Sequence, residues 1–182
     1  EAQVVGDIQI SNQVKRAYQT AADLELAGPF LHRLMHTIFF TNKRVVQETA
    51  FRDGAASLSY ATIELIESLT QNIFQPRVLV IGLGEIGEDV AKNMVHLPTA
   101  QIKITNRTLS KAETLAHDLH GHAYPLNELP AFDKGFDVMI TCTGSEHHII
   151  TPEIYENLLK GETDRKVVID LALPQDIDPE IV

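Results

Sequence analysis

Apolar residues recur along this chain with two different spacings, which divide it into two parts. Between residues 10 and 73 they return every three or four positions, the spacing of one face of a helix. This pattern predicts three helices: one that stops before Gly28-Pro29, one that ends near Asp53-Gly54, and one with Ser59 as its N-cap. Because no strand pattern appears before residue 77, the first part is expected to be helical.

Beyond Pro76, short β-branched runs alternate with helical segments. Strands are predicted at residues 77–81, 101–105, 122–124, 137–141 and 166–171. Helices are predicted at residues 85–97, from a capping box of Ser110 and Glu113 to Gly121, and from an N-cap at Thr151-Pro152 to Gly161. This alternation produces right-handed βαβ units. The predicted fold class is therefore α/β, a doubly wound parallel sheet in residues 54–182 preceded by a helical segment in residues 1–53.

Composition and charge narrow the class of protein. Apolar residues make up 44% of the 182, which is enough for a sizeable core. A single cysteine, Cys142, excludes an internal disulfide framework and favours a reducing, cytoplasmic location. No apolar run reaches the roughly 20 residues that a membrane span needs. The net charge of −10 argues against a broad electrostatic grip on nucleic acid by this chain alone. The first residue is Glu1, which suggests a fragment or a processed product.

A glycine motif follows the first predicted strand and opens the next helix. Its six residues are Gly82, Leu83, Gly84, Glu85, Ile86 and Gly87. In this context Gly82 permits a tight turn, Gly84 lets backbone amides approach a pyrophosphate, and Gly87 lets the helix pack closely on the strand. The helix N-terminus attracts phosphate charge. We therefore expect a Rossmann-like dinucleotide site, the alternative being a glycine-rich turn without a ligand.

The end of the second strand indicates which dinucleotide is preferred. An NAD site would place Asp or Glu there to hold the ribose hydroxyls, whereas this chain has Asn106, Arg107 and Thr108, with Lys111 one turn later. A guanidinium attracts the 2′-phosphate of NADPH and can bind it bidentately. The sequence thus predicts NADPH as cofactor, unless these cations are solvated surface residues.

A second part of the predicted dinucleotide site follows the fourth strand. Small and hydroxyl side chains at Thr143 and Gly144 would let the nicotinamide half lie close to the backbone, although a plain strand-ending turn is an equal alternative. Cys142, at the end of a buried strand, is expected to be an inert core residue. The adjacent pair His147 and His148 cannot chelate one metal in extended chain, so no metal site is predicted. No catalytic residue is expected in this chain.

Taken together, these motifs resemble the glutamyl-tRNA reductase family over essentially the whole chain. The resemblance rests on the glycine motif, the Asn106 triplet, Thr143-Gly144 with residues 147–151, and residues 169–179, together with upstream segments at residues 4–18, 43–49 and 54–65. It implies a homodimeric enzyme of tetrapyrrole synthesis. In that family a cysteine thiolate attacks the ester of glutamyl-tRNA, and NADPH reduces the resulting thioester to glutamate-1-semialdehyde.

The resemblance also implies what this chain lacks. The nucleophilic cysteine and its catalytic histidine belong to a preceding part, and the dimerisation region to a following one, so the fragment alone is expected to be inactive. Asp7, Ile8, Gln9 and Gln13 correspond to positions near the glutamyl substrate. Asp7 is shorter than the family's usual Glu, and Ala2, Val46 and Gln175 also depart from the family pattern, which weakens the transfer of those roles.

Two other functions fit parts of the sequence. A shikimate-dehydrogenase-like NADP oxidoreductase has a similar glycine loop and Asn-Arg-Thr triplet, but it requires an α/β substrate domain upstream, where this chain predicts helices. A non-catalytic module that senses NADPH or binds a partner is the third candidate. A cysteine nucleophile upstream and a helical dimerisation region downstream would distinguish the first function from both.

Overall fold

The fold comes from a computed structural model that describes residues 8–49, 57–97 and 100–181. The chain divides into two compact units, residues 1–61 and 62–182. The predicted boundary between residues 53 and 54 lies outside the described residues and stays a prediction. In the described part of the chain, no helix is long and apolar enough to cross a membrane.

The first unit contains a helical hairpin. Helix α1 spans Ile8–Asp23 and helix α2 spans Pro29–Glu48. Pro29, at the first turn of α2, follows an extended Gly28 (φ −74°, ψ 172°), so the predicted break lies where the sequence placed it. Helix α2 ends at Glu48, before its predicted end, because Thr49 is extended (φ −135°, ψ 161°); Asp53 and Gly54 lie outside the described residues.

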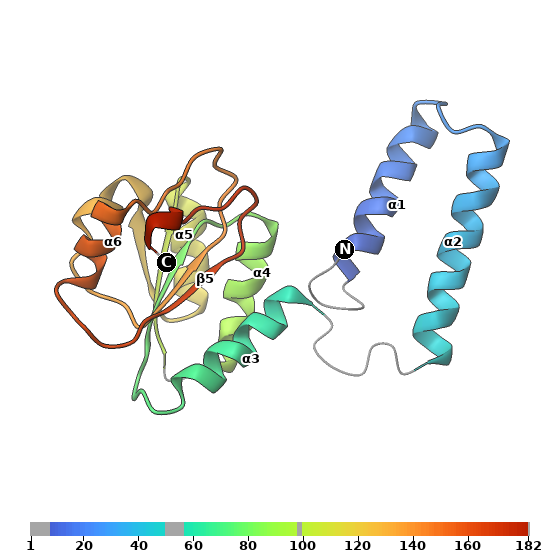
Figure 1. Ribbon diagram of the computed structural model, residues 1–182. Helices are drawn as coiled ribbons and strands as arrows, with labels where there is room; N and C mark the ends of the chain where they lie inside the picture. Colours follow the sequence, from blue (N-terminus) through green and yellow to red (C-terminus); the bar gives the residue numbers. More distant parts are fainter. Residues whose placement is uncertain (1–7, 50–56, 98–99, 182) are drawn as a thin grey trace. The chain divides into compact units, whose positions relative to one another are not determined.

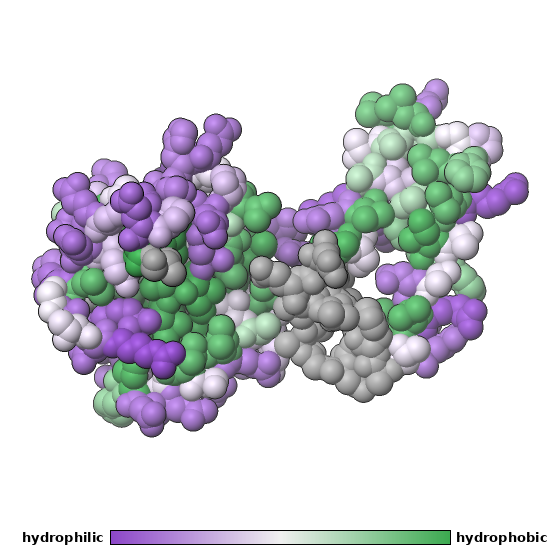
Figure 2. Space-filling model, viewed as in Figure 1, coloured by the Kyte–Doolittle hydropathy of each residue, from purple (hydrophilic) through white to green (hydrophobic). Residues whose placement is uncertain are grey.

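The contacts between the two hairpin helices include aromatic side chains. The Tyr18 hydroxyl lies 2.6 Å from His32 Nδ1, and the Tyr18 and Phe39 rings are 5.8 Å apart. Of the described apolar residues in this unit, only Ala27 and Met35 are buried. Large apolar side chains are instead exposed on the hairpin, as the green atoms of Figure 2 show: Ile10, Val14, Leu24, Leu26, Phe30, Leu34, Ile38, Phe40 and Val45.

The second unit is built on a five-stranded parallel sheet of order β3-β2-β1-β4-β5. Its strands are β1 (Arg77–Ile81), β2 (Gln101–Asn106), β3 (His122–Pro125), β4 (Val138–Thr141) and β5 (Val167–Asp170). The registers Ile81↔Thr105 and Ile81↔Thr141 bring the carboxyl ends of β1, β2 and β4 to one edge. The predicted doubly wound α/β fold is thus confirmed.

Helices cover both faces of this sheet (Figure 1). One face packs against α3 (Leu58–Thr70), α4 (Glu85–Asn93) and α5 (Leu109–Asp118), through a core that includes Ile66, Val80 and Ile104. The other packs against α6 (Pro152–Leu159) and the 3-10 segment η2 (Leu126–Ala131), through Leu79, Phe136 and other buried residues. Shorter 3-10 turns lie at Met94–His96 (η1) and Pro179–Ile181 (η3). Strands buried on both faces explain the continuous apolar runs in the sequence.

Two of the predicted helix caps are wrong. Helix α3 already includes Ser59, and its first turn is capped by Ser57, whose hydroxyl accepts a hydrogen bond from Tyr60 N at 3.2 Å. Helix α5 begins at Leu109, after Thr108, so Ser110 lies inside the helix and cannot form a capping box with Glu113. The cap at Thr151 is confirmed, since its side chain accepts from Ile154 N with Pro152 in the first turn.

Candidate functional site

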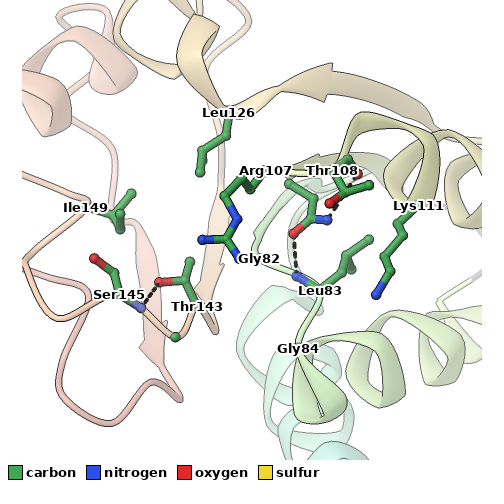
Figure 3. Close-up of a pocket in the computed structure, with 12 residues that line it drawn as sticks. Gly82, Leu83, Gly84, Arg107, Thr108, Lys111, Leu126, Thr143, Ser145 and Ile149 are labelled. Carbon is green, nitrogen blue, oxygen red and sulfur yellow. Dashed lines mark hydrogen bonds between the residues drawn. The ribbon is translucent and has the colours of Figure 1, made fainter.

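A cavity of about 320 Å³ opens where the carboxyl ends of β1, β2 and β4 meet. Its walls come from four connections that are far apart in sequence: the β1–α4 loop, the β2–α5 loop, the start of η2, and the loop after β4 (Figure 3). The lining residues are Gly82, Leu83, Gly84, Asn106, Arg107, Thr108, Lys111, Leu126, Thr143, Gly144, Ser145 and Ile149. A crevice at this edge is where open α/β sheets bind ligands.

Two glycines of the motif are required by close backbone approaches. Gly82 has φ +94°, and a Cβ there would lie 2.6 Å from the carbonyl oxygen of Cys142. A Cβ at Gly87 would lie 2.3 Å from the carbonyl oxygen of Gly82. Both distances are too short for real contacts, so only glycine lets the β1–α4 loop lie against β4 and lets α4 pack on that loop.

Gly84 is required for a different reason. A Cβ there would meet only the Cys142 carbonyl oxygen, at an ordinary 3.7 Å, so the protein itself has room for a side chain. The residue is exposed, lines the cavity and precedes α4 without a side-chain cap on that helix. A helix start of this kind leaves its amides to an anion. The loop therefore fits a pyrophosphate.

Asn106 joins the two loops on which the cofactor prediction depends. Its Oδ1 accepts a hydrogen bond from Leu83 N at 3.1 Å, and its Nδ2 donates to Thr108 O at 3.1 Å. The amide thereby fixes the spacing between the glycine loop and the β2–α5 loop. A carboxylate would keep the first bond and lose the second, because it has no proton to donate.

Arg107 and Lys111 supply the positive charge of the cavity. Arg107 extends into it between Leu126 and Gly82, whereas Lys111 lies on the other side of Leu83 (Figure 3). Both residues are exposed. No Asp or Glu is among the residues that line the cavity, so nothing in its walls repels a phosphate. Lys111 also lines a neighbouring cavity of about 380 Å³ between α4 and α5.

Cys142 lies directly behind the glycine loop and is 6% exposed. Burial, together with the negative charges of Asp176 and Asp170, raises the pKa of its thiol to about 11. A thiol with such a pKa stays protonated near neutral pH, and a protonated thiol is a poor nucleophile. The side chain instead fills space beside α4, with its Cβ 3.2 Å from where a Cβ of Gly87 would be.

Most of the predicted cofactor residues come together, and three do not reach the cavity. Glu85, Ile86 and Gly87 form the first turn of α4 behind it; Glu85 is exposed, Ile86 is half-buried and Gly87 is buried. Leu126, Ser145 and Ile149 line the cavity but were not predicted as site residues. The signal for Leu126 was its place two residues after the predicted strand 122–124, at the same edge as the glycine motif.

The predicted substrate residues belong to the first unit. Asp7 lies outside the described residues, and of Ile8 the structure gives only its place in α1. Gln9 is half-buried and Gln13 is exposed on the same helix. Elsewhere, among the described residues, no three His, Cys, Asp or Glu side chains gather as a metal ion would require.

Comparisons with known proteins cover both units. Residues 1–49 match the family model of the glutamyl-tRNAGlu reductase N-terminal domain, and residues 64–182 match that of shikimate / quinate 5-dehydrogenase. The chain is 50% identical to a glutamyl-tRNA reductase of Cytophaga hutchinsonii over 179 residues, which is 98% of this chain and 42% of that protein. It is 39% identical to a glutamyl-tRNA reductase of Chlorobium phaeobacteroides, over 98% of this chain and 42% of that protein.

Solved structures give the same result. The glutamyl-tRNA reductase from Methanopyrus kandleri superimposes with a TM-score of 0.59 and 32% identity, over 99% of this chain and 46% of that one. One dipicolinate synthase structure, from Bacillus halodurans, shares the fold alone, at 21% identity and a TM-score of 0.54 over 66% of this chain. The chain thus spans less than half the length of the reductases it matches. It belongs to the glutamyl-tRNA reductase family, and its residues 64–182 form a domain of the shikimate / quinate 5-dehydrogenase type.

Proposed function

We propose that the cavity binds a nicotinamide dinucleotide and prefers NADPH. The observation that carries this proposal is the guanidinium of Arg107 inside a cavity with no carboxylate in its walls. In this arrangement the glycine loop faces the pyrophosphate, and Arg107 with Lys111 binds the 2′-phosphate. Asn106 holds these two subsites at a fixed spacing through its bonds to both loops.

The bound cofactor would supply hydride at the far end of the cavity. Because Arg107 fixes the adenosine half on the β2 side, the nicotinamide half extends toward Thr143, Gly144 and Ser145 on the β4 side. The small side chains there leave the nicotinamide ring access to the backbone. The chain's own contribution is therefore to bind, orient and shield the cofactor.

The cofactor preference is tested by titrating the chain with NADPH and NADH. We expect NADPH to bind at least about tenfold more tightly, because a bidentate Arg–phosphate contact contributes about 1.5–3 kcal/mol. Arg107→Ala should reduce this ratio to about twofold or less while leaving the affinity for NADH nearly unchanged. Arg165→Ala, which removes another exposed arginine that does not line the cavity, is the matched control. Equal affinities of the unmodified chain for the two cofactors would contradict the assignment of Arg107.

For the whole protein we propose the activity of the family: reduction of glutamyl-tRNA to glutamate-1-semialdehyde at the entrance of tetrapyrrole synthesis. Support comes from the two family models, which match successive parts of the chain in the order expected of such a reductase. Glutamyl-tRNA would be bound mainly outside this chain, since the chain carries a net charge of −10. A homodimer formed through a following region and a cytoplasmic location belong to the same proposal.

This proposal predicts that the chain alone is catalytically silent. Supplied with glutamyl-tRNA and NADPH, it should form no aldehyde and oxidise no NADPH above the rate without protein, because its single thiol is buried and protonated. The measurement is NADPH absorbance together with aldehyde trapping. Turnover that disappears in Cys142→Ala would show that the nucleophile had been placed wrongly. Oxidation of shikimate with NADP⁺ would instead support the alternative dehydrogenase, whose upstream α/β domain is replaced here by the α1–α2 hairpin.

A further inference from the structure

The β4 wall of the cavity is held by a residue that does not line it. Asp176 follows β5 and is 0% exposed. Its carboxylate accepts two hydrogen bonds from Thr143, one from the backbone N at 2.7 Å and one from Oγ1 at 2.5 Å. Its backbone oxygen accepts from Ile149 N at 2.7 Å and Ile150 N at 2.9 Å. Both ends of the loop that carries Thr143 and Ile149 are thus bound to a single residue.

A second carboxylate, at the end of β5, fixes Asp176 in turn. Asp170 accepts hydrogen bonds from the backbone N of Asp176 at 2.9 Å and of Ile177 at 3.1 Å. It also accepts from Ala172 N at 3.0 Å and from Thr141 Oγ1 at 2.9 Å. The ends of β4 and β5 and the segment after β5 are therefore joined around two neighbouring acids.

This arrangement sets the direction of each hydrogen bond. Thr143 Oγ1 accepts from Ser145 N at 3.1 Å, so its proton is available for Asp176. If residue 176 were asparagine, its amide N–H would point at Thr143 Oγ1, which already accepts a hydrogen bond from Ser145 N. The hydroxyl proton of Thr143 would then have no acceptor at residue 176. The geometry therefore favours an ionised acid at this position.

The acid is costly to bury. Burial, and then the neighbouring charge of Asp170, raises the pKa of Asp176 in spite of its two bonds from Thr143. A buried carboxylate beside another carboxylate contributes little to the stability of the fold, because desolvation and charge repulsion oppose the gain from its hydrogen bonds. Its two hydrogen bonds are made to Thr143, which lies on the loop that forms one wall of the cavity, whereas Ile149 and Ile150 are bonded by the backbone oxygen of Asp176.

We propose that Asp176 is a positioning residue for the nicotinamide half of the dinucleotide, acting through Thr143 and Ile149. This inference rests on the proposed function, because it assumes that the cavity holds such a cofactor. According to this inference, different residues hold the two halves of the cofactor at the two ends of the cavity. Arg107 and the glycine loop hold the adenosine and phosphate part, whereas Asp176 holds the wall for the other half.

The test compares two ligands that share only one half. NADPH occupies both ends, and adenosine 2′,5′-bisphosphate reaches only the β2 side. In calorimetric titrations of the 182-residue chain, Asp176→Asn should weaken NADPH about threefold to tenfold, because binding must then also order the Thr143 loop. It should change the affinity for the bisphosphate less than about twofold. Asp164→Asn is the control, since this exposed acid precedes β5 and does not line the cavity.

A second variant covers the case in which Asp176→Asn does not fold. Thr143→Val keeps the shape and the backbone N–H bond but removes the hydroxyl, and it should weaken NADPH selectively by about threefold to tenfold. Equal loss of both ligands in the folded variants would show general damage and overturn the inference, as would unchanged NADPH affinity. If the unmodified chain binds neither ligand, the proposed function itself fails.

Discussion

Gly84 and Gly87 lie three residues apart in one motif, yet an added methyl group should affect them differently. At Gly87 the Cβ would lie 2.3 Å from a backbone oxygen, so Gly87→Ala should destabilise the fold by at least about 2 kcal/mol through overpacking. At Gly84 the nearest atom is 3.7 Å away, so Gly84→Ala should fold normally. It should weaken NADPH binding, because the proposed function brings the phosphates close to that backbone. Urea denaturation and cofactor titration measure the two effects separately.

Gly28→Ala is the control for this pair, because a Cβ there meets nothing within 4 Å and Gly28 does not line the cavity. Its effect on cofactor binding should be negligible. A Gly84→Ala variant that binds NADPH normally would show that the phosphate approaches elsewhere. Such a result would leave the steric role of Gly87 intact, so the two glycines can be judged independently.

Cys142 packs against two glycines of the motif. Its carbonyl oxygen lies against Gly82 and its Cβ lies beside Gly87, so the residue is part of the packing behind the loop. Burial is the largest cause of the raised pKa of its thiol, and the charges of Asp176 and Asp170 add to it. The sequence predicted an inert core cysteine from its place at the end of a buried strand, and the burial of its side chain agrees with that role.

At the scale of elements, four charged residues join the amino ends of β1 and β4 to the connection before β5. Arg77 Nη2 lies 2.7 Å from both Asp137 Oδ1 and Glu162 Oε2, and Lys166 also pairs with Glu162. Arg77 first and Lys166 second lower the pKa of Glu162 to about 2. For Asp137, burial acts against ionisation, but hydrogen bonds from Arg77 outweigh it and lower the pKa. Both acids therefore favour the folded state when ionised.

This network predicts a specific pH dependence of stability. A carboxyl with a lowered folded pKa stabilises the fold above its unfolded pKa, here 4.5, and loses that effect as the pH falls toward about 2. Arg77→Met should lower the free energy of unfolding by about 2 kcal/mol at pH 7, a value discounted for the partial exposure of the pairs. The deficit should shrink as the pH falls from 4.5 toward 2.

The measurement is urea denaturation followed by circular dichroism at several pH values. Arg44→Met removes an exposed i,i+4 pair with Glu48 and should leave stability nearly unchanged, because solvent screens such pairs. A deficit in Arg77→Met that stays constant down to pH 2.5 would mean that the lost stability comes from packing and not from charge.

Elements with a strong period were predictable, whereas their ends and long-range contacts were not. Four strands and the glycine turn follow from β-branched runs and motif spacing, whereas β3 (His122–Pro125) contains no β-branched residue and has only a weak strand pattern. The cap at Ser59 was wrong because the hydroxyl of nearby Ser57 caps α3 instead, and the cap at Ser110 was wrong because α5 already begins at Leu109. The bond of Asp176 to Thr143 spans 33 residues, and no local pattern indicates it.

At the scale of the whole molecule, the two units differ in how much apolar surface they bury. Nearly all of the described core belongs to residues 62–182, whereas the hairpin buries Ala27 and Met35 and leaves Phe30 80% exposed. Hydrophobic burial is the main stabilising contribution to a fold, so the second unit has much the larger part of it. The cofactor prediction depends only on that unit, and the substrate prediction only on the first.

The order of the strands also determines when the cavity is completed during translation. The central strand β1 is synthesised first, β2 and β3 then extend one edge of the sheet, and β4 and β5 extend the other. The glycine loop and Arg107 are therefore made early, whereas Thr143 precedes its carboxylate by 33 residues. At roughly 5–20 residues per second, this interval lasts about two to seven seconds on the ribosome. If the proposed function holds, the residues that bind the adenosine phosphates are thus made before the chain can fix the wall for the nicotinamide ring.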